Sequence, residues 1–291
     1  MKTITPLGSK TYIPESPELF IMNKYEEISF TKEGENVYTI KMEGNSAGRQ
    51  VFSLKMLEEL SQSLRDAMFD KKYVEGNKIF VLKGTPEVFN YGGDLELFLG
   101  LLESKCLDGL KSYGKMCIDS LITTHNSVEY GMTTIALVEG TALGGGFEMA
   151  LGCNILIAED AATFGLPESN FGFFPGMGAF EFLHKRVGLE KTKEIVYSGK
   201  VFTAQEMFDL GVIDYLVPVG KGSDKISEII KSERENQFKF NNLRKIENSL
   251  HHISHDQMIK SVNLWAETVI NIPVKKKKFI QRLISRQYSK K

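Results

Sequence analysis

The stretch at residues 138–180 reads VEGTALGGGFEMALGCNILIAEDAATFGLPESNFGFFPGMGAF. Three consecutive glycines at 144–146 lead into an apolar run whose one carboxylate is Glu148, and a second carboxylate, Glu168, follows twenty residues later. A sharp turn that opens into a helix presents backbone N–H groups without intrahelical acceptors, which suits a developing oxyanion. Two carboxylates beside such a turn can divide general acid and general base work between them. The stretch therefore has two interpretations: an acid–base site built on a glycine turn, or a loop glutamate at position 168 that is only a solvated charge or a helix cap.

A second glycine turn precedes this stretch. A buried strand is expected at residues 78–83 (KIFVLK), and it is followed by adjacent glycines at 92 and 93 and then by a helical apolar pattern. A strand at 133–138 (TTIALV) likewise feeds the glycines at 144–146 and the helix after them. The repeated order of strand, glycine turn and helix predicts an α/β core with two similar turns that present backbone donors.

The two glycine turns have three interpretations. A phosphate cradle is disfavoured because the sequence contains neither a GxGxxG nor a GxxxxGK[ST] pattern. Tight turns that let a helix pack closely are a purely structural account. In the third interpretation, one peptide N–H from each turn points at a single carbonyl oxygen, and this requires the two turns to converge.

The remaining pattern extends the core and adds helices behind it. Strands are expected at 27–30, 36–42, 155–158, 162–164 and 212–218, and helices from Ser53, around 95–102, and at 115–124, 147–153, 188–199, 203–211 (with Thr203 as N-cap), 226–240, 254–271 and 275–288. Residues 220–224 (GKGSD) are the best linker. We therefore expect a core at residues 1–219, of which residues 1 to about 25 form a loose arm, and a helical region at 220–291.

The charge of the chain is balanced overall and uneven along its length. The 291 residues carry a formal net charge of −1, which gives no indication of a nucleic-acid partner. Residues 240–291, however, contain 11 Lys and Arg against 3 Asp and Glu, a formal +8. This basic tail has two interpretations: a solvated helical face, or a docking site for an acidic partner or a phosphorylated cofactor.

Cysteines and histidines give no sign of a disulfide framework or a metal centre. Cys106, Cys117 and Cys153 lie in apolar sequence without CxxC spacing, so we expect reduced core thiols. The histidines at 251, 252 and 255 include an i, i+4 pair, but no HExxH motif is present, and surface histidines are expected. No run approaches 18 apolar residues and no GxSxG motif occurs. We expect a soluble cytoplasmic protein without membrane insertion.

The segment EGTALGGGFEMALGCNILIAEDAATFGLPESNFGFFPGMGA, followed by VYSGKVFTAQEMFDLGVIDYLVP, resembles the crotonase (enoyl-CoA hydratase/isomerase) superfamily. The resemblance runs from about residue 78 to residue 218 and keeps the GGG(F)E, LPE and PGMGA motifs in order. NYGGDL resembles the first oxyanion segment of that superfamily, with Asn90 and Tyr91 in place of small residues. The resemblance implies an α/β (α+β) fold, a spiral of ββα repeats with a C-terminal helical region, and a homotrimer or hexamer.

The same resemblance implies roles for individual residues. The N–H groups of Gly93 and Gly145 would grip a thioester carbonyl oxygen, and Glu148 and Glu168 match the two glutamates of hydratases. Retention of both glutamates implies addition or removal of water across the 2,3 bond of an acyl thioester, helped by stabilisation of the enolate. The acid and the base are not distinguished. The thioester carrier, coenzyme A (CoA) or acyl carrier protein, belongs to the substrate, and no separate cofactor or metal is implied.

A narrower resemblance is to the diffusible-signal-factor (DSF) synthase branch, through FPGMGA and the segments LWAETVINI and IQRLISRQYSKK. It implies dehydration of a 3-hydroxyacyl thioester on acyl carrier protein to a cis-2-enoyl product. A thioesterase step would then release a free unsaturated fatty acid, which is a quorum-sensing signal. The alternatives are an ordinary enoyl-CoA hydratase of fatty-acid metabolism and, from another class, a binding or regulatory partner of a sensor kinase.

The expected acyl pocket takes its residues from the glycine turn, the FGFFPGM segment and the tail. Met177, Trp265 and Leu283 are implied by the DSF-synthase resemblance, although helix-to-helix core packing is an alternative for Trp265 and Leu283. The residues expected to contact substrate are Gly144, Phe173, Phe174, Met177, Trp265 and Leu283.

Overall fold

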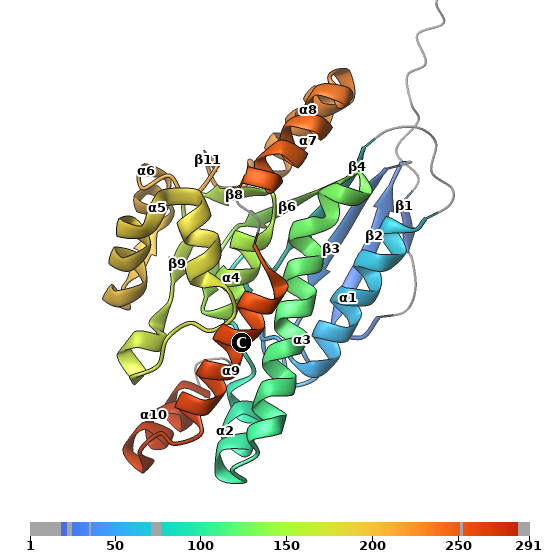
Figure 1. Cartoon of the computed structure of the whole chain (residues 1–291). Coiled ribbons are helices and arrows are strands. Elements are labelled where there is room, and N and C mark those ends of the chain that lie inside the picture. Colours follow the sequence, from blue (N-terminus) through green and yellow to red (C-terminus); the bar gives the residue numbers. More distant parts are fainter. Residues whose placement is uncertain (1–18, 22–24, 35, 71–76, 251–252, 285–291) are drawn as a thin grey trace, which may run out of the picture.

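The computed structural model describes residues 19–21, 25–34, 36–70, 77–250 and 253–284, and two β-sheets organise them (Figure 1). In the described residues the larger sheet has seven strands in the order β1-β2-β3-β4-β6-β8-β11. Its strands are β1 (Leu19–Ile21), β2 (Ile28–Glu33), β3 (Val37–Met42), β4 (Lys78–Lys83), β6 (Met132–Val138), β8 (Ile155–Glu159) and β11 (Tyr215–Val217). The pairs β1–β2 and β2–β3 are antiparallel, and every pair from β3 to β11 is parallel.

A smaller sheet lies beside the first and is built from three-residue strands. Its order is β10-β9-β7-β5, with β5 (Val88–Asn90), β7 (Thr141–Leu143), β9 (Thr163–Gly165) and β10 (Val201–Thr203). The pairs β5–β7 and β7–β9 are parallel, and β9–β10 is antiparallel.

Three times, the chain forms a strand of the larger sheet, then a strand of the smaller sheet, and then a helix. β4 leads to β5, α2 (Leu95–Glu103) and α3 (Leu107–His125); β6 leads to β7 and α4 (Gly145–Gly152); β8 leads to β9, the 3-10 turn η2 (Pro167–Phe171) and α5 (Ala179–Ser198). The expected spiral of ββα repeats is thereby confirmed. The expectation that each long strand feeds its glycine turn directly is wrong, because β5 and β7 intervene. Strands this short are held by their neighbours and leave no periodic pattern.

Both faces of the larger sheet are covered, as parallel strands require. On β4, Phe80 and Leu82 belong to the main core, which they share with buried residues of α1 (Leu54–Met68), α3 and α4. The alternate side chains Ile79 and Val81 face a second cluster, which α7 completes with Ile226 and Ile229. Alternate side chains along a strand thus pack into two separate cores, one on each face of the sheet.

The C-terminal helices are packed onto the core. They are α7 (Gly222–Glu235), α8 (Gln237–Leu250), α9 (His255–Val269) and α10 (Val274–Ile284); α9 packs along α3, and α10 packs against α2 (Figure 1). The expected linker at 220–224 is wrong from Gly222 onward, because α7 begins there. The N–H of Gly222 donates to Glu159 Oε1 at 3.1 Å, and a methyl group at Gly222 would lie 2.4 Å from Leu137. Close packing on the sheet, rather than flexibility, accounts for this glycine.

Other helix boundaries confirm or correct the expectations. Ser53 caps α1 by accepting the N–H of Met56, and Thr203 caps α6 (Ala204–Asp209) in a capping box with Glu206. The helix expected at 226–240 divides at Asn236, whose N–H bonds to the carbonyls of Ser232 and Glu233. The helix expected at 188–199 is the second half of α5, and the left-handed φ of 77° at Gly188 marks its start.

Further expectations fall partly or wholly outside the described residues. The expected N-terminal arm lies outside the described residues except at Leu19–Ile21, which form β1. His251, His252 and the tail after residue 284 also lie outside the described residues. The 3-10 turn η1 (Asn126–Tyr130) follows α3.

Cys117 and Cys153 are buried, but Cys106 is exposed at the N-cap of α3, so the expectation of a core thiol is wrong for Cys106. None of the described helices combines the length and apolar character needed to cross a bilayer.

Gly146 provides a test of how closely the layers pack. A methyl group at Gly146 would lie 2.1 Å from the backbone oxygen of Asn90, whereas one at Gly100 on α2 would meet no atom within 4 Å. We expect Gly146→Ala to lower the free energy of unfolding by about 3 kcal/mol or more. Gly100→Ala, the matched control, should raise it by about 0.5–1 kcal/mol. Urea denaturation of both variants measures the difference, and equal stabilities would contradict the packing described here.

Candidate active site

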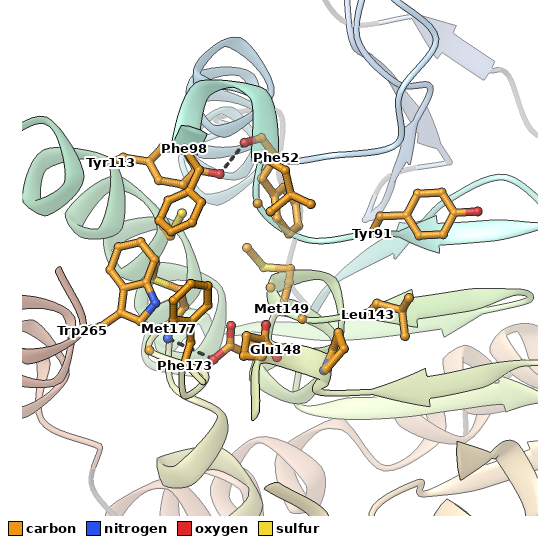
Figure 2. A pocket seen from close by; sticks show the side chains of 18 of the residues that line it. Phe52, Tyr91, Phe98, Tyr113, Leu143, Glu148, Met149, Phe173, Met177 and Trp265 are labelled. Carbon is orange, nitrogen blue, oxygen red and sulfur yellow. Dashed lines mark hydrogen bonds between the residues drawn. The ribbon is translucent and has the colours of Figure 1, made fainter. Parts of the chain in front are cut away.

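A cavity of about 450 Å³ opens between the start of α4, the segment around η2 and the helices α2, α3, α9 and α10 (Figure 2). Most of its wall is apolar, and its polar residues are few. The lining includes Phe52, Leu57, Tyr91, Gly93, Leu95, Phe98, Tyr113, Cys117, Leu121, Leu143, Gly144, Gly145, Glu148, Met149, Pro167, Glu168, Asn170, Phe173, Gly176, Met177, Val201, Trp265, Ile280 and Leu283. An enclosed apolar space with a small number of polar groups is typical of a ligand site.

The two glycine turns converge in this cavity. Gly92 has a left-handed φ of 93°, and a methyl group there would lie 2.8 Å from the nitrogen of Gly145. A methyl group at Gly145 would in turn lie 3.6 Å from the nitrogen of Gly93. Because neither position carries a side chain, the two backbones come into contact and the nitrogens of Gly93 and Gly145 lie near one another. Gly144, with φ of 50°, makes the turn into α4, so Gly145 belongs to the first helical turn, where N–H groups lack intrahelical acceptors.

The first turn is anchored by polar groups on both sides. Asn90 is fully buried, and its Oδ1 accepts the N–H of Gly92 at 2.7 Å. Asp94 caps α2 by accepting the N–H groups of Glu96 and Leu97, and it forms a buried ion pair with Arg49 at 2.8 Å. The larger residue Asn90, in a place where the superfamily often has a small one, therefore stabilises the turn by a side-chain hydrogen bond.

Glu148 is buried in the first turn of α4, with 1% of its surface exposed. Its Oε1 accepts the backbone N–H group of Met177 at 2.9 Å (Figure 2) and that of Ala179 at 3.1 Å, so the carboxyl ties α4 to the first residue of α5 and to the segment before it. Burial raises the pKa of Glu148, and the nearby charge of Glu168 raises it further. The two N–H bonds and the N-terminal end of the helix favour the charged form, but burial is the larger effect.

Glu168 follows Pro167 in η2 and is half-buried in the cavity wall. Its Oε1 packs against Gly144, where a methyl group would lie 2.6 Å away. Its Oε2 is buried and has no hydrogen-bond partner among the described residues. Burial raises the pKa of Glu168 as well. A buried carboxyl oxygen without a protein partner, beside the second glycine turn, is suited to bond a substrate or a water molecule.

Aromatic side chains close the cavity on the side of α2 and α9. Trp265 stacks on Phe98 with ring centroids 5.5 Å apart, and Phe98 meets Phe173 edge-on at 6.1 Å. Trp265 can approach because Gly176 has no side chain: a methyl group there would lie 2.6 Å from the indole. Met177, and Leu283 of α10, also line the cavity.

Phe174 is placed differently from its neighbour Phe173. It is absent from the cavity lining and packs, half-buried, against the cluster formed by α2, α9 and α10. Phe98 and Tyr113 line the cavity but were not among the expected site residues. The apolar stripe of α2 predicts a buried face that includes Phe98, but only the position of α9 makes that face a cavity wall.

The described residues contain no group of three or more His, Cys, Asp and Glu side chains that could hold a metal ion. The polar groups of the cavity lining include the two carboxyl groups together with Tyr91, Tyr113, Cys117 and Asn170, and the glycine turns add backbone N–H groups. This set can transfer protons and stabilise a developing oxyanion.

A ββα spiral with two converging glycine turns and two glutamates in one cavity defines a protein of the crotonase fold. The chain belongs to the enoyl-CoA hydratase/isomerase family, whose family model matches residues 32–278. It is an enoyl-CoA hydratase-like enzyme, a hydro-lyase by class.

Individual relatives agree with this assignment. The chain is 30% identical over 194 residues to YngF of Bacillus subtilis (strain 168), which carries a provisional enoyl-CoA hydratase/isomerase assignment; the match covers 66% of this chain and 69% of YngF. It is 28% identical over 177 residues to mitochondrial methylglutaconyl-CoA hydratase of Mus musculus, covering 61% and 53% of the two chains. The enoyl-CoA hydratase structure from Bacillus halodurans superposes with a TM-score of 0.73 at 19% identity, covering 88% and 99%, and thus shares the fold.

The buried carboxyl pair makes stability depend on pH. Both pKa values are raised above that of an unfolded glutamate, so the folded state binds more protons and its stability falls as pH rises above about 4.3. We expect Glu168→Gln to raise the free energy of unfolding by about 1–3 kcal/mol at pH 9 and by less at pH 5. Thermal unfolding at both values tests this, with the exposed Glu190→Gln as control. A gain that did not grow with pH would contradict the burial of a charged pair.

Proposed function

We propose that this enzyme dehydrates a medium-chain 3-hydroxyacyl thioester and then hydrolyses the enoyl thioester to a free unsaturated fatty acid, as a DSF synthase does. The observation that carries the proposal is the placement of Glu148, which is buried, and of Glu168, whose Oε2 is buried, beside the junction of the two glycine turns. An apolar cavity that extends from this junction to Trp265 and Leu283 suits an acyl chain.

In the first step the thioester carbonyl oxygen accepts the N–H groups of Gly93 and Gly145. These donors stabilise the enolate, and the proton on C2 becomes easier to remove. One glutamate, as the carboxylate, takes the C2 proton, while the other, as the carboxylic acid, protonates the 3-hydroxyl group. The C3–O bond breaks, water leaves and the 2,3 double bond forms. The raised pKa values of both glutamates support this, because a pair that holds one proton near neutral pH can act as acid and base together.

The proposed second step uses the same donors. Water attacks the thioester carbon, a glutamate carboxylate takes its proton, and the two N–H groups stabilise the tetrahedral oxyanion. The C–S bond then breaks, and the thiol of the carrier leaves with a proton from the glutamate pair. Support comes from the unpartnered Oε2 of Glu168, which can hold a water molecule beside the second turn, and from the resemblance to DSF synthases.

The carrier is proposed to be acyl carrier protein rather than CoA. The basic tail supports this choice, since it would complement an acidic carrier. Ordinary enoyl-CoA hydration is the second candidate, and the names of the relatives favour it. A role as the binding partner of a sensor kinase is compatible with catalysis, but it would not by itself explain two glutamates in one cavity.

Substitution of each glutamate tests the acid–base pair. Glu148→Gln and Glu168→Gln keep the side-chain shape but remove the proton transfer, so we expect each to lower product formation by about 10²–10⁴-fold. The assay is mass spectrometry of products from 3-hydroxydodecanoyl carrier protein, with the exposed Glu190→Gln as control. Normal turnover by both variants would rule out the assigned roles. In the wild type, free cis-2-dodecenoic acid would support both proposed steps, whereas a trans-enoyl thioester alone would favour the ordinary hydratase.

The length of the acyl pocket can be tested at α10. Leu283 lines the cavity, whereas Leu264 on α9 is 59% exposed. We expect Leu283→Trp to fill the far end of the cavity and to move the preference, measured as kcat/KM, toward shorter acyl chains by about 10-fold or more, equivalent to about 1.4 kcal/mol. The control Leu264→Trp should leave the chain-length profile unchanged. An unchanged profile in Leu283→Trp would remove α10 from the acyl pocket.

A further inference from the structure

Tyr113 of α3 connects the first glycine turn to the start of α1. Its side chain is buried, with 4% exposed, and lines the cavity. The hydroxyl group donates to the backbone oxygen of Phe52 at 2.7 Å (Figure 2) and accepts the backbone N–H of Asp94 at 3.1 Å. One hydroxyl therefore links two backbone segments that are about forty residues apart in the chain.

Hydrogen bonds that lead back to Phe52 restrain both of the peptide groups that flank Gly93. The Phe52 N–H donates to the Gly92 oxygen at 2.8 Å, so this oxygen points toward Phe52. In a trans peptide the N–H lies opposite the C=O, and the Gly93 N–H is therefore directed away from Phe52. On the other side of Gly93, the Asp94 N–H is held by the Tyr113 hydroxyl, which in turn is held by the Phe52 oxygen.

These bonds form a closed ring of backbone groups with Tyr113 as its one side-chain member. Gly93 has no side chain of its own to restrict rotation about its backbone bonds. A methyl group at Gly93 would lie 3.2 Å from the Tyr113 hydroxyl, so the tyrosine also packs directly against it. Removal of the hydroxyl would take away the side-chain restraint on the peptide on the Asp94 side of Gly93 and leave the parallel β-bridge between Phe52 and Gly93.

We propose that Tyr113 is a positioning residue that, together with the Phe52 bond to the Gly92 oxygen, holds the Gly93 N–H toward the thioester carbonyl oxygen. The proposal rests on the proposed function in so far as Gly93 is an oxyanion donor there. Such donors contribute most when their direction is fixed before the charge develops, and errors of a few tenths of an ångström reduce the stabilisation.

The chemistry of the position favours a tyrosine. The side chain at position 113 must accept one hydrogen bond and donate another through the same hydroxyl group. Phenylalanine has nearly the same shape but can do neither. Burial raises the pKa of Tyr113 well above its ordinary value, so the hydroxyl keeps its proton. It therefore remains both donor and acceptor throughout the pH range of the glutamate pair.

The test compares Tyr113→Phe with Tyr38→Phe. Tyr38 is also buried, and its hydroxyl donates to Asp70 at 2.8 Å, but it does not line the cavity. The probe is dodecanoyl-CoA labelled with ¹³C at the thioester carbonyl, which has no 3-hydroxyl group and cannot dehydrate. Infrared difference spectra of the full-length protein report how far the bound carbonyl stretch moves to lower frequency, and this shift measures polarisation by the N–H donors.

We expect Tyr113→Phe to lose at least half of the carbonyl shift and to lower kcat by about 10-fold or more, with KM changed much less, because one of two donors is misaligned. Tyr38→Phe should lose stability and keep the wild-type shift. An unchanged shift in Tyr113→Phe, with activity reduced only in proportion to the folded fraction, would overturn the positioning role. If Tyr113→Phe does not fold, 4-aminophenylalanine at position 113 keeps a donor toward Phe52 and is a poor acceptor for Asp94. An intermediate shift would then support the proposal, and a wild-type shift would overturn it.

The spectra also separate this proposal from the proposed function. A carbonyl shift in the wild type that Tyr113→Phe reduces would support the positioning role even if no dehydration product forms. The absence of any shift in the wild type on bound thioester would overturn the positioning role, because no donor would then be aligned with the carbonyl.

Discussion

The structure depends on the contact between two backbone turns that have no side chains to keep them apart. A methyl group at Gly92 would meet the nitrogen of Gly145, and one at Gly146 would meet the oxygen of Asn90. These contacts join the β5–α2 and β7–α4 units, which belong to successive turns of the ββα spiral. Because the two turns are locked together, the backbone nitrogens beside them share one small volume. The cavity, the glutamates and the acyl wall are all arranged around that volume.

The two glutamates of the cavity carry an energetic cost that is related to their use. An ionised carboxyl in an apolar cavity is disfavoured, and two of them close together are disfavoured further. Glu148 is partly compensated by the N–H groups of Met177 and Ala179. Glu168 leaves one oxygen without a partner among the described residues. The carboxyl pair thus makes the folded protein less stable than apolar side chains in the same place would. The same unfavourable environment lets the pair exchange protons near neutral pH. Loss of stability at a site that requires reactive groups is a common compromise.

The C-terminal helices determine the shape of the cavity rather than its chemistry. α9 packs along α3 and brings Trp265 over Gly176, and α10 packs against α2 and contributes Ile280 and Leu283 to the wall. Among the described residues, Trp265 of α9 and Phe173 after η2 stack around Phe98 of α2. Sequence differences in the C-terminal helices can therefore change which acyl group fits, while the glycine turns and glutamates of the core stay the same.

The sequence by itself determined the long strands, most helices, the glycine turns and the identity of Glu148 and Glu168, because each depends on local pattern or on a motif in consecutive residues. It missed β5 and β7, since three-residue strands exist only through pairing with their neighbours. It also placed a linker where Gly222 packs on the sheet, and it gave no sign that Phe173 lines the cavity whereas Phe174 is absent from the lining. The convergence of the two turns, the partners of each glutamate and the hydrogen bonds of Tyr113 were decided by the tertiary structure alone. They join residues that are distant in the chain, and no local periodicity records which distant backbone a glycine or a hydroxyl will meet.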